Sequence, residues 1–390
     1  MLAHRQPMIS SVRRDAWLEI DLNAIERNIG ITRSWLKAGT RLMAVVKSDA
    51  YGHGAAGVAD VMGACGASWL GVASIDEGAQ LRAAGSDLPI LILSPSPSWA
   101  MQNALDANLT LTVTSASQLL DLEALCRRQE RRASVHLKID TGMHRLGVLP
   151  KNLGDIIKIL KQNKWVKLEG VFTHFAKADE EDFTLFQTAV FEKALQEIEK
   201  EGLKASLIHL ASSDACRRFP KTHFDMVRVG LYLYGLEAKK ASDFLEAAMS
   251  VKARINQIQN LDEGESLGYN LTWTTSKASR IASIPIGYAD GIDRRLSNNM
   301  KALLMGKEIK QVGLISMDQM LFDVSEVPDA QEGDIVTLIG RQEANKSEQV
   351  LPLADWANKL DTITYELACR LRARMPRIYT RNFQLEGKHE

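Results

Sequence analysis

The sequence predicts a (β/α)8 barrel followed by a C-terminal, mostly antiparallel β domain. Short apolar runs alternate with longer amphipathic stretches up to about residue 245, and beyond that point strand-like runs follow one another without helices between them. Strands that alternate with helices form parallel sheets, and eight such units suit a closed barrel. The 390-residue chain also exceeds the usual size of a single hydrophobic core, so two domains are expected.

The apolar runs of the first part are the expected barrel strands. Their nearly continuous apolar character is typical of parallel strands, which are buried on both faces. In chain order the runs are LMAVVK (42–47), WLGVAS (69–74), PILILS (89–94), LTLTVT (109–114), SVHLKID (134–140), LEGVFTH (168–174), SLIHLAS (206–212) and DMVRVG (225–230).

Helices are expected between these runs, and several of them open on Ser, Asp or Asn, which are good N-cap residues. The expected helices are 55–65, 76–84, 115–128, 152–163 and 182–201. A doubly wound open sheet is the alternative arrangement, but eight evenly spaced units favour closure into a TIM-like barrel.

The change from alternating strands and helices to strands alone divides the chain into a barrel at 14–245 and a β domain at 246–390. Residues 1–13 could pack with the β domain. A final helix is expected over 362–373, capped by Asp361 or Thr362 and ended before Pro376. Gly, Asp and Asn turns separate the strand-like runs. These runs are ARINQIQNL (253–261), ASRIASIPIGY (278–288), KALLMG (301–306), KEIKQVGLISM (307–317), MLFDVSEV (320–327) and DIVTLIG (334–340).

Composition excludes several classes of partner. Lys plus Arg equals Asp plus Glu at 48 each, so no overall field draws the chain to nucleic acid or to an acidic membrane surface. The N-terminal segment carries charges and a proline where a signal peptide needs an apolar core, and no stretch reads as a membrane span. The four cysteines form no C-x-x-C pair, which fits reduced thiols. A cytoplasmic location is therefore expected.

Reactive groups should appear where the barrel strands end, because active sites of such barrels lie at the carboxyl ends of the strands. Polar and charged residues do close several runs, namely Lys47, Lys138, Asp140, His174, Ser212, Ser213, Arg228 and Gly230. A lysine that ends a strand is usually a solvated residue, and a lone histidine is usually structural. Convergence on one face favours the functional interpretation. Metal binding is the rival chemistry, but no H-x-H or H-E-x-x-H pair occurs, so no metal is expected.

Eight segments of the sequence resemble the alanine racemase family, in the order in which that family has them. They span about Asp15 to Arg377, and together they are highly specific although no single segment would be. The segments are AVVKSDAYGHG (44–54), KIDTGMHRLG (138–147), FTHFA (172–176), MVRVGLYLYG (226–235), LGYNLTW (267–273), IPIGYADG (284–291), ISMDQM (315–320) and TITYELACRLRARMPR (362–377).

The resemblance implies an alanine racemase that depends on pyridoxal 5′-phosphate, held as a Schiff base on Lys47. Racemisation removes a proton from one face of a planar centre and returns one on the other, so two opposed acid/base groups are needed. By resemblance these are Lys47 for the D-isomer and the partner's Tyr269 for the L-isomer. A head-to-tail homodimer is implied, in which each site takes residues from the partner's β domain and the product D-alanine serves cell-wall peptidoglycan.

The resemblance also assigns the residues around the cofactor and the substrate. His174 links Tyr269 to Arg228, and Arg228 faces the pyridine nitrogen. The phosphate contacts are Tyr51, Ser213, the backbone N–H groups of Gly230 and Leu231, and Tyr365. The substrate carboxylate would meet Arg145 and the backbone N–H of Met317 from the partner. The supporting residues are Lys138, which is carbamylated in many members, and Tyr288 and Asp318, which line the substrate entrance.

Two departures from the family pattern concern the tuning of the cofactor. Ser212 stands where many members have Asn, and Ser48-Asp49 replaces a frequent Ala-Asn after the lysine. The alternative function is a serine or broad-specificity amino-acid racemase of the same fold. A decarboxylase with a barrel and a β domain conflicts with the segments GYADG, DTGMHRLG and GYNLTW. A non-catalytic cofactor carrier predicts a lone barrel, which the second domain contradicts.

Overall fold

A computed structural model describes residues 15–236, 244–344, 347–371 and 374–381 of the chain. These residues form two compact units. The barrel unit comprises residues 26–50 and 55–233. The β unit comprises the described parts of 1–25, 51–54 and 234–390.

The barrel unit contains eight parallel strands, and each of the eight apolar runs overlaps one of them, with ends that differ by up to three residues. Neighbours in the sheet follow the order β8-β7-β6-β5-β4-β3-β2-β9. The strands are β2 (Arg41–Val45), β3 (Ala67–Val72), β4 (Ile90–Pro95), β5 (Thr110–Val113), β6 (Ala133–Lys138), β7 (Val166–Phe172), β8 (Leu207–His209) and β9 (Met226–Val229).

The sheet begins at β8 and ends at β9, and these two strands are joined by isolated backbone hydrogen bonds and not by a regular ladder. At this seam between β8 and β9, the backbone N–H of Asp225 donates to the carbonyl of Ile208 at 3.0 Å. The N–H of Arg228 donates to the carbonyl of Ala211 at 2.9 Å. The sheet is therefore a nearly closed barrel, and the predicted fold class is confirmed.

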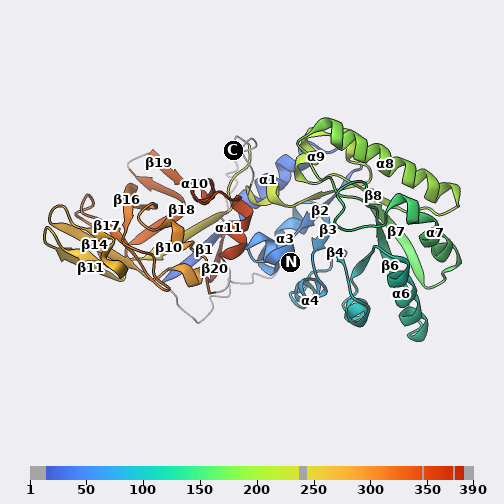
Figure 1. Cartoon of the computed structure of the whole chain (residues 1–390), viewed down its shortest axis with the longest axis horizontal. Coiled ribbons are helices and arrows are strands. Elements are labelled where there is room, and N and C mark those ends of the chain that lie inside the picture. Colours follow the sequence, from blue (N-terminus) through green and yellow to red (C-terminus); the bar gives the residue numbers. More distant parts are fainter. Residues whose placement is uncertain (1–14, 237–243, 345–346, 372–373, 382–390) are drawn as a thin grey trace, which may run out of the picture. The chain divides into compact units, whose positions relative to one another are not determined.

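Helices surround the barrel strands (Figure 1), and the five expected helices are present. Ser115 is the cap that the sequence suggested, since its Oγ accepts from the N–H of Gln118. The helix expected from Asp76 is capped instead by Ser74, whose Oγ accepts from the N–H of Glu77. The helices expected to open on Asn152 and Asp182 have no side-chain cap. The helices of this part of the chain are α1 (Leu22–Ser34), α3 (Ala55–Ala64), α4 (Ile75–Ala83), α5 (Met101–Asp106), α6 (Ala116–Arg128), α7 (Leu153–Gln162), α8 (Glu181–Lys200) and α9 (Ser213–Arg218).

The barrel interior changes character along the strands. One layer is apolar and holds Met43, Trp69, Leu91, Leu207 and Met226. Nearer the carboxyl ends, buried polar side chains take over, namely His136, Lys138, His209 and Arg228. Because alternate residues of a strand face the same side, these polar groups and the apolar layer share the inside of the barrel.

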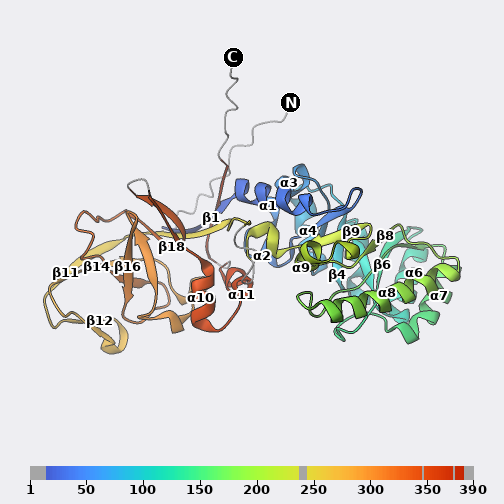
Figure 2. The ribbon, with the colours of Figure 1, turned by 90° about the horizontal axis from the view of Figure 1, so that it is seen from above.

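The β unit is built on a sheet with the order β11-β14-β17-β16-β15-β18-β10-β1-β20, with β19 paired to β18 (Figure 2). All its ladders are antiparallel except that between β1 and β20. A separate hairpin joins β12 to β13. The strands are β1 (Ala16–Asp21), β10 (Met249–Arg254), β11 (Gln257–Leu261), β12 (Ser266–Leu267), β13 (Trp273–Thr274), β14 (Ser279–Ile284), β15 (Lys301–Leu304), β16 (Lys307–Val312), β17 (Met320–Asp323), β18 (Ile335–Ala344), β19 (Ser347–Leu351) and β20 (Arg377–Thr380).

Two features differ from the sequence-based expectation. Strand β1 pairs with β10 and β20, so it belongs to the sheet of the β unit, whereas the sequence placed it in the barrel segment 14–245. Residues 1–13 lie outside the described residues. The final helix expected over 362–373 corresponds to α11 (Thr364–Arg370), and a further helix that the sequence did not predict, α10 (Leu353–Leu360), precedes it. The expected caps are wrong, because Asp361 has φ 51° and ends α10, and Ile363 precedes α11 without a side-chain cap.

Across the described residues, none of the helices combines the length and the apolar character that a membrane crossing requires. The four cysteines are free thiols, and Cys126 and Cys216 are buried.

Candidate active site

Arg228 lies at the centre of a polar cluster at the carboxyl ends of the barrel strands. It stands on β9 and is 4% exposed. Its guanidinium donates to the carbonyls of Thr173 (2.7 Å), His209 (3.0 Å) and Leu210 (3.1 Å). It also donates to Nδ1 of His209 at 3.0 Å and to Nδ1 of His174 at 3.1 Å. Among the described residues, all five acceptors are neutral.

These contacts determine the protonation of the two histidines. A guanidinium only donates, so Nδ1 of each ring is an acceptor and the ring proton lies on Nε2. Burial, and then the charge of Arg228, lowers the pKa of His174 and of His209 well below the ordinary value of 6.5. Both rings are therefore neutral at pH 7, and His174 offers an N–H donor at its Nε2.

Further cations surround Arg228. Lys138 ends β6, is 6% exposed and has its Nζ 5.3 Å from the centre of the Phe172 ring. Burial first, and then the charges of Arg228, Arg145 and Lys47, lower the pKa of Lys138 from 10.5 to about 8. Burial also lowers the pKa of Arg228 to about 9, so its guanidinium stays charged at neutral pH. The cluster is strongly cationic.

The loop after β6 carries Arg145. Oδ1 of Asp140 accepts from the backbone N–H groups of Gly142 and His144, both at 3.0 Å. The backbone N–H of Val148 then donates to the carbonyl of Lys138 at 2.8 Å, so the loop returns to the strand from which it started. Asp140 thus uses its carboxylate to shape the loop.

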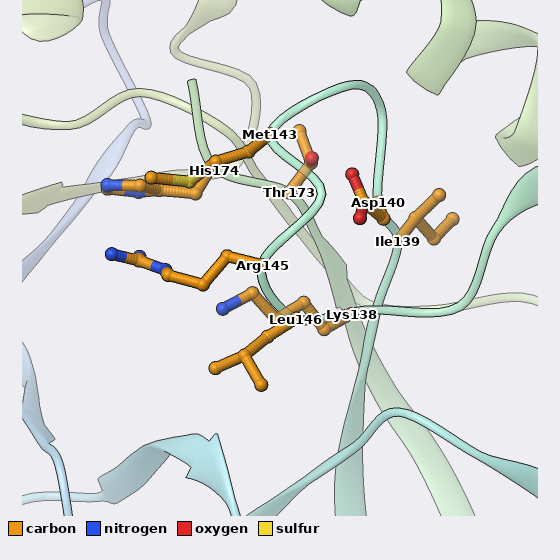
Figure 3. Close-up of a pocket in the computed structure, with 8 residues that line it drawn as sticks. All are labelled: Lys138, Ile139, Asp140, Met143, Arg145, Leu146, Thr173 and His174. Carbon is orange, nitrogen blue, oxygen red and sulfur yellow. The ribbon is translucent and has the colours of Figure 1, made fainter. Parts of the chain in front are cut away.

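This loop and the end of β7 line a small pocket (Figure 3). In the figure the nitrogen-bearing ends of Lys138, Arg145 and His174 point to the same side. The lining residues are Lys138, Ile139, Asp140, Met143, Arg145, Leu146, Thr173 and His174. Three sequence-predicted residues therefore come together here: the positive charges of Lys138 and Arg145 and the N–H donor of His174 suit an anionic group.

The backbone after Lys47 forms a left-handed turn, labelled α2 (Lys47–Tyr51). Ser48, Asp49 and Ala50 have φ of 53° to 55° and ψ of 45° to 49°. L-residues disfavour this conformation by about 1–2 kcal/mol each. The carboxylate of Glu77 stabilises the turn, because it accepts from the backbone N–H of Ser48 at 2.7 Å. Strain of this kind concentrates at functional sites.

Ser213 and Gly230 lie together at the ends of β8 and β9. Ser213 opens α9 and is 6% exposed, and its Oγ accepts from the backbone N–H of Gly230 at 3.1 Å. Leu231 follows at the start of the short helix η4 (Leu231–Tyr234). The barrel unit therefore supplies three of the five expected phosphate contacts, and the other two, Tyr51 and Tyr365, belong to the β unit.

Tyr269 lies in the β unit, at the tip of the β12–β13 hairpin. It opens the short helix η5 (Tyr269–Leu271) and is 70% exposed. Its successors Asn270 and Leu271 have φ of 59° and 49°, so the tip is tightly turned. An exposed phenol on a hairpin tip is accessible to a second molecule.

The other expected residues of the β unit also lie at its surface. Tyr288, in η6 (Tyr288–Asp290), and Met317 are exposed, and the N–H of Tyr288 donates to the carbonyl of Ser316 at 3.0 Å. Glycine at 287 makes this approach feasible, because a Cβ there would lie 2.3 Å from the same carbonyl oxygen. Asp318 forms an ion pair with Arg374 at 2.7 Å.

Sequence reasoning missed three residues that organise the barrel cluster. Glu77 stands three residues after Ser74, a spacing that indicates a helix cap, yet its carboxylate also holds the turn after Lys47. His209 lies two residues after the inward-facing Leu207 on the same strand. This alternation could have indicated that His209 also faces the barrel interior. Buried Gln187 on α8 donates to the carbonyl of His174 at 3.2 Å, and nothing in a helix sequence marks such a role.

The arrangement brings cations and N–H donors together, and the Asp140 carboxylate that also lines the pocket already accepts from two backbone N–H groups. The cations and donors suit an anionic ligand. Across the part of the chain that the structure describes, no three His, Cys, Asp or Glu side chains gather in a way that could hold a metal ion. The barrel and its cationic cluster define a class: a barrel enzyme whose site receives a small anionic molecule.

Comparison with known proteins identifies the family. The model of the alanine racemase N-terminal domain matches residues 20–238, and that of the C-terminal domain matches residues 248–379. The chain is 40% identical to an alanine racemase of Nostoc sp. over 375 residues, 93% of this chain and 95% of the relative. The chain therefore belongs to the alanine racemase family, whose members are pyridoxal-phosphate-dependent isomerases, and alanine racemisation is the function that this similarity supports.

Solved structures agree. The chain superposes on the alanine racemase of Clostridium difficile 630 with a TM-score of 0.88 at 32% identity, covering 95% of this chain and 97% of that one. An alanine racemase from Bartonella henselae with covalently bound pyridoxal phosphate matches with a TM-score of 0.81 at 29% identity, covering 94% and 100%.

Proposed function

We propose that the protein interconverts L-alanine and D-alanine by a two-base mechanism, with pyridoxal 5′-phosphate on Lys47 and with Tyr269 contributed by a second copy of the chain. The observation that carries the proposal is Arg228, a buried guanidinium among neutral acceptors at the strand ends. When bound, pyridoxal phosphate withdraws electrons from the substrate carbon that loses its proton.

The donors of the barrel unit fit this cofactor. The Ser213 hydroxyl and the backbone at Gly230 and Leu231 provide polar groups for a phosphate, close to the last strands as in other barrels. Tyr51 and Tyr365 would complete the set. Arg228 would donate to the pyridine nitrogen. A guanidinium keeps its proton, so it limits electron withdrawal by the ring and disfavours side reactions such as transamination.

Two acid/base groups would move the substrate proton. Lys47 Nζ would serve the D-isomer, and the phenolic oxygen of the partner's Tyr269 would serve the L-isomer. An ordinary phenol is protonated at neutral pH, so Tyr269 needs a donor or a cation nearby to act as a base. His174 suits this duty, because its Nδ1 is fixed as an acceptor by Arg228 and its Nε2 carries the proton.

The remaining residues would bind and select the substrate. Arg145 and the backbone N–H of the partner's Met317 would hold the carboxylate. The partner's Tyr288 and Asp318 would restrict the entrance to small side chains. Lys138, with a pKa of about 8, has an appreciable neutral fraction at pH 7, which supports carbamylation because only a neutral amine combines with carbon dioxide.

The four free thiols support a cytoplasmic enzyme. We propose that it supplies D-alanine for peptidoglycan, which growth of a D-alanine-requiring bacterium carrying this gene would check. Serine or broad-specificity racemisation is the alternative.

The decisive experiment incubates the purified holoenzyme with L-alanine, L-serine or L-lysine in deuterated water and follows optical rotation and α-deuterium together. L-alanine should lose its rotation while deuterium enters the α-position, faster than either other amino acid. Deuterium exchange with retained rotation would refute racemisation, and faster turnover of serine or lysine would move the assignment to the alternative.

A matched pair of variants tests the lysine. Lys47→Ala should abolish both the loss of optical rotation and the incorporation of α-deuterium. Lys167→Ala, at an exposed lysine of β7, should leave both unchanged.

A further inference from the structure

A line of buried side chains leads from Arg228 through the barrel interior to a carboxylate. Nε2 of His209 lies 2.8 Å from Nδ1 of His136, and Nε2 of His136 lies 3.8 Å from Oε2 of Glu169. Both histidines are 0% exposed, whereas the Glu169 side chain is 24% exposed. The line therefore connects the buried guanidinium to an anion that reaches solvent.

Only one arrangement of protons satisfies this line with neutral rings. Nδ1 of His209 accepts from Arg228, so the ring proton lies on Nε2 and is donated to Nδ1 of His136. His136 must then carry its own proton on Nε2, which faces Glu169. Burial lowers the pKa of both rings, which agrees with their neutrality at pH 7.

The last step of the line is the one that lacks a close bond. Nε2 of His136 is buried and has no hydrogen-bond partner among the described residues. A buried N–H without an acceptor is costly, and a distance of 3.8 Å exceeds a direct hydrogen bond. The Glu169 carboxylate is the anion that faces this nitrogen, and a small rotation of it would bring the two within hydrogen-bond distance.

Two local features of β7 produce this geometry. Val135 pairs with Leu168 and His136 pairs with Gly170, so Glu169 is the additional residue of a β-bulge. Bulges redirect side chains that would otherwise alternate regularly. A Cβ on Gly170 would lie 2.5 Å from Nδ1 of His136, so glycine is what leaves room for the imidazole.

Aromatic packing holds the line in place. The Phe172 ring stacks on His209 with centroids 4.8 Å apart and planes 5° from parallel. Trp69 packs against His136 with centroids 5.3 Å apart. The two imidazoles therefore have little freedom to turn over.

We propose that His136 and Glu169 are positioning residues for Arg228. Together with His209 they form a hydrogen-bond relay of fixed direction, from the guanidinium of Arg228 to the carboxylate of Glu169. The relay compensates the buried charge from a distance. A carboxylate in direct contact would bind the guanidinium itself and compete with the ligand for its N–H groups. The purpose of the relay rests on the proposed function, whereas its proton arrangement does not.

The proton arrangement can be measured in the unmodified holoenzyme with 15N-labelled histidine. Ring-nitrogen shifts should show two neutral imidazoles with protons on Nε2, joined by a scalar coupling across the N–H···N bond that identifies them as His209 and His136. A doubly protonated ring, a proton on Nδ1 of either ring, or absence of the coupling overturns the relay. This measurement decides the relay even if racemisation itself failed its own test.

Glu169→Gln tests the role of the carboxylate. We expect kcat for L-alanine to fall about 5- to 10-fold with KM changed less than about 2-fold, because the loss acts through Arg228 after binding. The His136 ring signals should move while the His209 tautomer is retained. The matched control is Glu201→Gln, the same chemical change at an exposed carboxylate paired with Lys161 at 2.9 Å, and it should alter none of these.

Two outcomes of that comparison would overturn the role. An unchanged kcat in Glu169→Gln shows that Arg228 does not depend on the carboxylate. A lower kcat with unchanged ring signals shows that the substitution acts through general stability and not through the relay.

Discussion

Arg228 shows how a single charged residue is accommodated without an adjacent counter-ion. Its guanidinium makes five hydrogen bonds to carbonyls and imidazole nitrogens, and across the described residues no carboxylate pairs with it. Burial of an unpaired charge is expensive, so each of these neutral acceptors offsets part of that cost. The histidines therefore have to stay neutral, which gives them a measurable signature.

That signature is acid sensitivity. His136, His174 and His209 have pKa values lowered by burial, so near pH 6.5 and below the unfolded chain binds more protons than the folded chain. The contribution of these three histidines to stability should be complete above about pH 6.5. It should be lost as the pH drops further, by up to about 1.4 kcal/mol per pH unit for each histidine. Denaturant titrations between pH 8 and pH 5 measure this.

A free energy of unfolding that stays flat down to pH 5 would show that the buried rings accept protons in the folded state.

At the scale of elements, the left-handed turn after Lys47 is the least expected feature. Four consecutive non-glycine residues, 48 to 51, have φ between 52° and 55°. Contacts from elsewhere hold them: the Glu77 carboxylate bonds the start of the turn, and the Asp49 carboxylate accepts from the N–H of Ala55 at 2.8 Å. The turn is thus imposed by tertiary bonds against local preference.

Relief of this strain should be measurable. Ser48→Gly removes a Cβ from a left-handed position and should raise the free energy of unfolding by about 0.5–1 kcal/mol, the steric relief less the entropy of glycine. The same change at Ser34, in the right-handed helix α1, should lower it by about 0.5 kcal/mol. If both substitutions changed the free energy of unfolding in the same direction, the strain at Ser48 would be contradicted.

The elements that the sequence predicted are those with a strong local signal. The eight barrel strands followed from continuous apolar runs, and five of the helices between them followed from periodicity and caps. Helix α1 was not predicted although it has 13 residues, and the six-residue helix α9 is too short to show a period. Helix α10 was not predicted either, and its end depends on Asp361 adopting φ 51°, which no composition signal announces.

The candidate site divides in the same way. Lys47, Lys138, His174 and Arg228 could be found because barrel chemistry lies at strand ends. Glu77 and Gln187 could not, since their contribution depends on which distant backbone groups they meet.

For the whole molecule, the expected site residues are divided between two structural units. Lys47, His174 and Arg228 belong to the barrel unit, whereas Tyr269 stands exposed on a hairpin of the β unit. In the proposed dimer each site would combine a barrel unit from one chain with Tyr269 from the other. A single chain would then hold both bases without having a complete site of its own.

Mixing two inactive variants tests this sharing. Lys47→Ala and Tyr269→Phe should each be inactive as homodimers, but a mixed dimer would contain one site with both natural residues. Random pairing of coexpressed chains should therefore restore roughly a quarter of wild-type racemisation, since half the dimers are mixed and each has one competent site of two. The control pairs Lys47→Ala with the Lys47→Ala, Tyr269→Phe double variant, which should restore nothing. Failure of the first mixture would refute shared sites.

The seam between β8 and β9 limits how this chain could evolve toward other chemistry. The backbone N–H and the guanidinium of Arg228 both bond to residues at or just after β8, so the side chain assigned to the cofactor also closes the barrel wall. A descendant with a carboxylate at this position, suited to reactions that need a stronger electron acceptor, would keep the backbone bonds of the seam but lose the guanidinium bonds to His209 and Leu210 at the same step. The change of chemistry would therefore also weaken the barrel wall, which makes this seam a barrier to functional drift.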